Sequence, residues 1–241
     1  MVLPDSKRYK IAKLSNLELL MSQSTLISRR NALLSMAAIP AALSVTTLPA
    51  FAQSAPRSEG SVDVEKLMSE GALPEMFEGE EDAPVTIVEY ASMTCGHCAN
   101  FHKNTYPELK EKYIDTGKVR LIMREFPFDP RAAAAFMLAR CAPNGAYFPM
   151  VDVLFKQQAT WARAENARAP LENIAKLAGF TQESFEKCLT DQQLLNDVNK
   201  VRERGQTEFE VNATPTFFIN GEKYAGALTI DQLSAIIDDL L

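Results

Sequence analysis

The chain has 241 residues, 46% of them hydrophobic and 23% charged, and its formal net charge is −6. This balance is that of an ordinary globular protein, and it does not fit a largely disordered, collagen-like or coiled-coil chain. The acidic net charge argues against nucleic acid as a partner, because no basic surface can be built from it. Four cysteines are too few to cross-link a scaffold of this size, so each needs a specific explanation.

Residues 1–52 have the pattern of an export signal. Six basic side chains lie within the first 30 residues, and residues 31–56 contain no ionisable side chain. The hydrophobic stretch leads to Ala50-Phe51-Ala52, whose small residues are typical of a signal cleavage site. We therefore expect cleavage after Ala52 and a periplasmic mature protein.

Three details of this export signal stay open. The uncharged run of 26 residues is long enough to span a bilayer, so an uncleaved membrane anchor is the alternative. Arg29-Arg30 and the residues around them resemble a twin-arginine signal, but an ordinary Sec signal with two adjacent arginines also fits. Translation could begin at Met1 or at Met21, because residues 21–52 alone make a complete signal.

The mature chain begins with a polar, acidic segment, residues 53–82, in which only 62–70 have a helical pattern and 78–82 are interpreted as a solvated linker. Residues 84–90 are rich in β-branched side chains and predict a strand. A helix is expected from the Cys-x-x-Cys motif to about residue 114, with a kink at Pro107. A second strand follows at 119–123, and the helical crossover predicts parallel pairing of the two strands.

The middle of the chain, residues 129–208, is predicted to be entirely helical. Its helices are expected at 131–141, 147–157 and 171–178, followed by two more with Thr181 and Thr190 as N-caps.

The strand period returns at 215–219, and Asn220-Gly221 predicts a hairpin that pairs this strand with 222–224. A capping box at 229–232 opens a C-terminal helix. The apolar face of that helix comprises Leu233, Ile236, Ile237 and Leu240. We therefore expect residues 83–128 and 209–241 to form one α/β layer, with 129–208 inserted into it as a helical domain.

The motif Cys95-Gly96-His97-Cys98 lies directly after a predicted strand and at the start of a helix. A lone Cys-x-x-Cys is a weak signal and can be half of a zinc site. At a helix N-terminus, however, free backbone N–H groups and the helix dipole favour a thiolate on the first cysteine. His97 would add to this effect if it is protonated or donates a hydrogen bond. A stabilised thiolate makes the disulfide form easy to reduce, which is the property of a protein that oxidises other thiols.

Glu89, the Cys95–Cys98 motif and Thr214-Pro215 together resemble the thioredoxin superfamily, and the order of the elements resembles its DsbA-type branch. The resemblance covers residues 83–241 and implies an α/β, thioredoxin-like fold with an inserted all-helical domain. It also implies a thiol-disulfide oxidoreductase, for which we expect no bound cofactor and no metal ion.

By this resemblance, Cys95 is the exposed nucleophile, and Cys98 attacks back on the mixed disulfide. Glu89, six residues before the nucleophile, is the buried acid that assists proton transfer, although taken alone it would be interpreted as a surface residue of an edge strand. Pro215 is the cis-proline that faces the disulfide, and an extended substrate could pair with the backbone of Thr214. The motif departs from a common DsbA pattern at Gly96, where many such enzymes have proline.

The remaining cysteines and histidine have separate interpretations. Cys141 and Cys188 are either buried free thiols or, as an oxidising compartment favours, a structural disulfide. His102 is interpreted as a partly exposed helix residue, and a metal site of both histidines with Cys95 and Cys98 has poor spacing. Trp161, Phe217 and Phe218 are assigned to the core.

We therefore expect an exported, monomeric oxidoreductase that donates a disulfide to reduced substrate proteins. The resemblance suggests a membrane quinone-linked oxidase as the partner that recycles it. A disulfide isomerase or reductase of the same fold is one alternative, because Cys-Gly-His-Cys is the motif of protein disulfide isomerases. A non-enzymatic chaperone or metal-binding protein is the alternative from another class.

Overall fold

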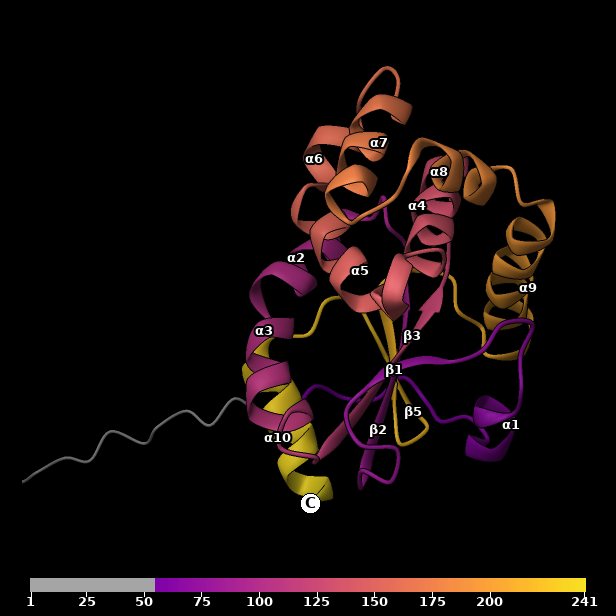
Figure 1. Cartoon of the computed structure of the whole chain (residues 1–241). Coiled ribbons are helices and arrows are strands. Elements are labelled where there is room, and N and C mark those ends of the chain that lie inside the picture. Colours follow the sequence, from indigo (N-terminus) through magenta and orange to yellow (C-terminus); the bar gives the residue numbers. More distant parts are fainter. Residues whose placement is uncertain (1–54) are drawn as a thin grey trace, which may run out of the picture. The chain divides into compact units, whose positions relative to one another are not determined.

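The computed structural model describes residues 55–241 (Figure 1). The expected export signal, its cleavage after Ala52 and the choice between Met1 and Met21 lie outside the described residues. Within the described part of the chain, no helix is both long and apolar enough to cross a membrane.

A five-stranded mixed sheet forms the centre of the described structure, with the strand order β1-β3-β2-β4-β5. Its strands are β1 (Met76–Glu78), β2 (Val85–Ala91), β3 (Val119–Glu125), β4 (Thr216–Ile219) and β5 (Glu222–Ala225). The pairing of β2 with β3 is parallel, as the helical crossover predicts, and the other three pairings are antiparallel. The strand that leads to the cysteine motif, β2, is therefore the middle strand and is paired on both sides.

Strand β1 was not predicted, and the interpretation of residues 78–82 as a solvated linker is wrong for Glu78. This residue is the last of β1 and pairs with Leu121 of β3, and its carboxylate accepts a hydrogen bond from the Tyr106 hydroxyl. Three residues are too few to show a strand period, so only pairing with the neighbouring strand defines β1.

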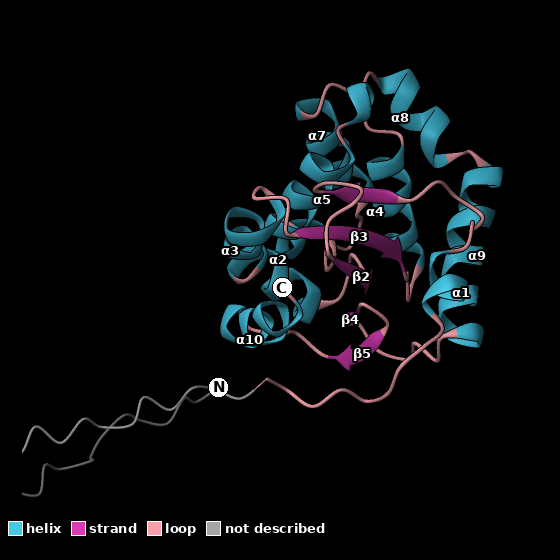
Figure 2. Cartoon of the chain, turned by 90° about the horizontal axis from the view of Figure 1, so that it is seen from below, coloured by secondary structure: helices cyan, strands magenta, loops and turns pink. Residues whose placement is uncertain are grey.

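Helices cover both faces of the sheet (Figures 1 and 2). One face is covered by α2 (Gly96–Asn104), α3 (Tyr106–Leu109) and α10 (Ile230–Leu240), and the other by α1 (Val64–Met68) and α9 (Gln192–Glu208). The helix that was predicted to continue to residue 114 is interrupted at Thr105, and a π-helix, η1 (Lys110–Ile114), follows α3. The break falls two residues before Pro107, in agreement with the predicted kink.

The segment between β3 and β4 contains helices and no strand, as predicted. They are α4 (Pro130–Arg140), a short 3-10 turn η2 (Pro143–Gly145), α5 (Tyr147–Lys156), α6 (Gln158–Trp161), α7 (Arg168–Leu177), α8 (Gln182–Leu189) and α9. They enclose a core of their own around Phe136, Phe155 and Trp161, and this core continues to Cys98 in α2. The fully buried indole of Trp161 donates its N–H to the Leu154 carbonyl. Its assignment to the core is confirmed, as are those of Phe217 and Phe218, which are both buried.

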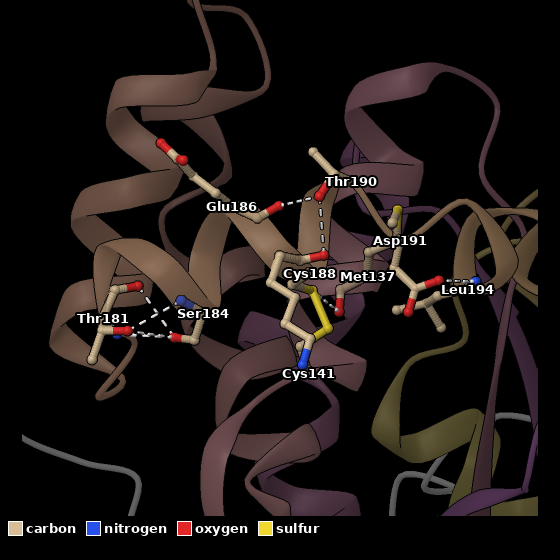
Figure 3. The surroundings of a disulfide bond; sticks show 10 residues. Met137, Cys141, Thr181, Ser184, Glu186, Cys188, Thr190, Asp191 and Leu194 are labelled. Carbon is tan, nitrogen blue, oxygen red and sulfur yellow. Dashed lines mark hydrogen bonds between the residues drawn. A yellow bond between two sulfur atoms is a disulfide. The ribbon is translucent and has the colours of Figure 1, made fainter.

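One predicted helix cap is correct and one is wrong. Thr181 closes a capping box with Ser184 at the start of α8. Thr190, in contrast, ends α8, where its hydroxyl donates to the Glu186 carbonyl at 2.8 Å (Figure 3). The N-cap of α9 is Asp191, whose carboxylate accepts from the Leu194 N–H at 2.9 Å. Threonine and aspartate are both good N-cap residues, so the sequence alone does not decide whether Thr190 or Asp191 caps α9.

A disulfide joins Cys141, just after α4, to Cys188 in α8, with an S–S distance of 2.11 Å (Figure 3). It connects two helices of the inserted segment across a sequence separation of 47 residues.

The C-terminal predictions hold with one exception. Asn220 and Gly221 both have positive φ, as a tight hairpin turn requires, and β4 pairs with β5 across them. Thr229 and Gln232 form the predicted capping box of α10. The exception is Leu240, which is 43% exposed and does not join the buried face of that helix.

Candidate active site

The cysteine motif sits where β2 passes into α2, and Cys95 is the N-cap residue of that helix. The Cys95 side chain is half-buried, whereas Cys98, one turn further along, is 0% exposed, and both are free thiols here. The first cysteine can therefore be reached from solvent and the second cannot.

The Cys95 thiolate is strongly stabilised. The pKa of Cys95 is lowered from its ordinary value of 9.0 to about 5. A hydrogen bond from the Cys98 thiol is the largest cause, and the Thr214 side chain and the backbone N–H groups of Cys98 and His97 add smaller effects, against the opposing effect of burial. At neutral pH the exposed sulfur is thus almost fully ionised, and the thiolate is the nucleophilic form.

Cys98 is shifted in the opposite direction. Burial, followed by the neighbouring Cys95 and the charge of Glu89, raises the pKa of Cys98 well above its ordinary value. The two cysteines therefore differ in reactivity: one is a partly exposed thiolate, and the other is a buried thiol that must lose a proton before it can attack.

Thr214 and Pro215 come from the far end of the chain and lie against Cys95. Their peptide bond is cis, and the Thr214 carbonyl oxygen is 3.2 Å from the Cys95 Sγ. The Thr214 hydroxyl is buried and has no hydrogen-bond partner among the described residues, which leaves it free to donate to the thiolate. The start of β4 thus forms one wall of the site.

Glu89 is 0% exposed and belongs to the middle strand, so the structure does not place it on a sheet edge. Side chains alternate along β2, and Glu89 points to the same face as Val85 and Ile87, which is the face that α2 covers. A carboxylate at this depth requires a partner.

The partner of Glu89 is His102, and the expectation of a partly exposed His102 is wrong. This histidine is 2% exposed, and its Nε2 lies 3.1 Å from Glu89 Oε2 and 3.3 Å from Oε1. His102 is four residues after Cys98, so the two share one face of α2. The sequence contains this spacing, but only the depth of Glu89 in the sheet shows that the face is buried.

The His97 side chain is exposed and makes no hydrogen bond within the described part of the chain. The backbone N–H of His97 helps to lower the pKa of Cys95, so this residue acts on the thiolate through its main chain and not through its imidazole. Between residues 55 and 241 there is also no group of three or more histidine, cysteine or acidic side chains placed to hold a metal ion.

Two contacts at the site were not anticipated from the sequence. In α6, Gln158 donates its amide to the carbonyl oxygens of Met93 at 2.8 Å and Cys95 at 2.9 Å. Thr94 donates to Asp129, the residue that caps α4. The Asp-Pro pair at 129–130 is a recognisable helix start, but no local pattern singles out Gln158.

The chain matches the thioredoxin family over residues 72–239. Among solved structures, alpha-DsbA1 of Wolbachia pipientis is 32% identical, with a TM-score of 0.69 over 74% of this chain and 96% of that one. The chain belongs to the DsbA-type branch of the thioredoxin superfamily. The expected thioredoxin-like fold with a helical insertion is thereby confirmed for this DsbA-type protein.

Curated relatives agree with this assignment. A putative protein-disulfide oxidoreductase of Rickettsia bellii is 36% identical over 173 residues, which are 68% of this chain and 63% of that protein. A probable disulfide bond formation protein D of Bacillus anthracis is 31% identical over 150 residues, 59% of this chain and 68% of that protein. The DsbA-type chain spans less than two thirds of the length of the Rickettsia relatives that it matches.

Proposed function

We propose that this DsbA-type protein is a disulfide oxidoreductase that donates the Cys95–Cys98 disulfide to reduced substrate proteins. The observation that carries the proposal is the contrast between the two sulfurs, a half-buried one with a pKa of about 5 and a fully buried one with a raised pKa. Stabilising the Cys95 thiolate stabilises the reduced protein, so its disulfide has a strong tendency to accept electrons.

The proposed reaction starts when a substrate thiolate attacks Cys95 Sγ of the Cys95–Cys98 disulfide. The Cys95–Cys98 bond breaks, a bond from Cys95 to the substrate forms, and Cys98 leaves as a thiolate that takes up a proton. A second substrate thiolate then attacks the substrate sulfur of this mixed disulfide, and Cys95 leaves as a stable thiolate. The substrate has lost two electrons to the enzyme, which ends as the dithiol.

Each remaining site residue has a role in this proposal. Glu89 lies close enough to Cys98 for its charge to affect that thiol, and it relays the proton that Cys98 gains or loses. Thr214 borders the exposed sulfur, and its backbone offers an extended substrate a strand to pair with. Pro215 holds that backbone beside Cys95. His97 supplies a backbone N–H to the thiolate.

We further propose that residues 1–52 direct export, that the mature protein works in the periplasm as a monomer, and that a membrane quinone-linked oxidase reoxidises Cys95 and Cys98. A disulfide between Cys141 and Cys188 suits such an oxidising compartment. Sequencing the N-terminus of the exported protein tests the first point, and Gln53 is the expected first residue.

The central experiment compares two substrates. The purified protein is incubated in its oxidised form with a fully reduced model protein and, separately, in its reduced form with one whose disulfides are scrambled. Oxidation of the first without rescue of the second supports the proposal, whereas rescue of the scrambled protein would identify an isomerase. Loss of the oxidase activity in Cys95→Ser is expected, and full activity of that variant would rule out the proposed mechanism.

A further inference from the structure

His102, the partner of the buried Glu89, has no role in the disulfide exchange proposed for Cys95 and Cys98. His102 and Glu89 are both buried, and a single imidazole nitrogen, Nε2, faces both carboxylate oxygens at 3.1 and 3.3 Å. An ionised carboxylate can only accept, so Nε2 carries a hydrogen when Glu89 is charged. Across the described residues Glu89 makes no other ion pair or side-chain hydrogen bond.

Apolar side chains surround the Glu89–His102 pair, which lies one helical turn from Cys98. The His102 ring stacks on Phe155 of α5 at a centroid distance of 4.3 Å and meets Phe101 edge-on at 5.3 Å. Across the sheet, the residue paired with Glu89 on β4 is the buried Phe217. These side chains exclude water, so the charge state of the pair depends on its few polar neighbours.

Among the described residues, the pKa values of three neighbouring side chains respond to the charge of Glu89. Cys98 is on the same face of α2, and its thiol responds to the charge of Glu89. Tyr106 of α3 lies with its ring 5.1 Å from His102, but its hydroxyl donates to Glu78. Tyr147 of α5 also responds to the charge of Glu89, but its hydroxyl donates to Glu125. In the reduced protein the Cys98 thiol donates to the Cys95 thiolate. Of the three groups, Cys98 is the one whose proton must be gained and lost during the reaction, because its sulfur forms and breaks the disulfide.

Charge balance decides where that proton can go. With a neutral imidazole beside the Glu89 carboxylate, the pair carries one negative charge, and one added proton on His102 makes it neutral. When Cys98 is a thiolate, the same single negative charge sits on sulfur. Moving a proton between Cys98 and the pair therefore leaves the total buried charge at minus one, and the large penalty of burying a second charge is avoided.

We propose that His102 is the proton-holding partner of Glu89, so that the Glu89–His102 pair, rather than Glu89 alone, exchanges one proton with Cys98 in each thiol-disulfide exchange. This inference rests on the proposed function. When the Cys95–Cys98 bond breaks, the protonated pair gives its proton to the departing Cys98 sulfur and becomes negatively charged. When Cys98 attacks a mixed disulfide in the reverse direction, the pair takes that proton back. His102 acts through Glu89 and is thus a positioning residue for the reacting sulfur.

The first test compares His102→Gln with Lys103→Gln in the full-length protein. Glutamine at 102 can still donate a hydrogen bond to Glu89 but cannot hold a proton, whereas Lys103 is exposed on the same helix, so its variant controls for the loss of a positive charge. The rate of oxidation of a reduced peptide dithiol is followed from pH 5 to 9. We expect His102→Gln to be slowed about tenfold or more and its pH profile to change shape. We expect Lys103→Gln to stay within about twofold of the unaltered protein.

The second test needs no substitution. The imidazole ¹⁵N shifts of His102 are compared in the oxidised and reduced protein, and a change in protonation between the two forms is expected. Unchanged nitrogen shifts, or a His102→Gln pH profile identical to that of the unaltered protein, would overturn the relay. Peptide oxidation by the unaltered protein would still support the proposed function in that case. An unaltered protein that cannot oxidise the peptide would instead refute the function itself.

Discussion

The Sγ of Cys95 lies 3.2 Å from the carbonyl oxygen of Thr214, although the two residues are 119 positions apart in the chain. This contact brings the start of β4 against the N-terminus of α2 and encloses the reactive sulfur between them. The carbonyl can only accept, and the donors to the thiolate are the Cys98 thiol and backbone N–H groups from α2 and the Thr214 hydroxyl from the segment before β4. Each side-chain donor can be removed separately.

The first prediction concerns the pH dependence of Cys95 in the reduced protein. Absorbance at 240 nm, which reports thiolate, should rise with a midpoint near pH 5. Because the pKa of Cys95 is lower in the folded state than in the unfolded state, ionisation stabilises the reduced fold as pH increases from 5 toward 9, and this stabilisation is lost as pH falls through 5. Urea unfolding of the reduced protein between pH 4.5 and 8 checks this. An absorbance titration with its midpoint above pH 8 would contradict the stabilisation of the Cys95 thiolate by its neighbours.

The second prediction uses two substitutions of Cys98, whose thiol is the main donor to the thiolate. Cys98→Ala should raise the pKa of Cys95 by about one, because a hydrogen bond to a charged group contributes about 1.5–3 kcal/mol and the half-exposed sulfur is partly screened. Cys98→Ser keeps a hydroxyl donor and should raise it less. The rate of iodoacetamide alkylation against pH measures both. Equal effects of the two substitutions would argue against a role for the donor.

The third prediction concerns the Thr214 hydroxyl, which is buried without another partner in the described structure. Thr214→Val keeps the shape and removes this donor, so the pKa of Cys95 should increase by less than in Cys98→Ala. Thr214→Ser, which retains the hydroxyl, is the matched control and should titrate like the unaltered protein. If Val and Ser variants titrate alike, the hydroxyl does not reach the thiolate.

The fourth prediction tests the contact between α6 and the active-site loop. Gln158→Ala removes two hydrogen bonds to the carbonyls of Met93 and Cys95 and should lower the free energy of unfolding by about 1–2 kcal/mol. Gln157→Ala alters the neighbouring residue, whose side chain makes no hydrogen bond in the described structure, and should have little effect. Urea denaturation measures both. If Gln157→Ala lowered the free energy of unfolding more than Gln158→Ala, the hydrogen bonds of Gln158 to the active-site loop would not be important for stability.

The fifth prediction addresses the disulfide of the inserted helices. Replacing both Cys141 and Cys188 with serine opens a link across a sequence separation of 47 residues and should lower the free energy of unfolding by about 4 kcal/mol in a chain-entropy treatment. Peptide oxidation at a temperature where the variant is folded should persist, because neither residue belongs to the Cys95 site. Alkylation of all four thiols in the unaltered protein, denatured without reductant, would contradict the Cys141–Cys188 disulfide.

Much of the fold could be predicted because its signals are local. The Cys95–Cys98 motif between a strand and a helix, the Asn220-Gly221 turn and the capping boxes at Thr181 and Thr229 each depend on residues that are neighbours in the chain. The short strand β1 and the boundary between Thr190 and Asp191 could not be predicted, since β1 depends on pairing with a distant strand and both residues at the boundary are good caps.

The sequence by itself determined which sulfurs can react and which elements carry them, because the placement of a cysteine at a helix N-terminus is a property of consecutive residues. Only the tertiary structure decided what surrounds those sulfurs. Burial in the middle strand turns Glu89 from an apparent surface residue into a carboxylate that needs His102, and the packing of α6 brings Gln158 to the loop. Burial and contacts between distant segments depend on how the whole chain packs, and no local pattern specifies them.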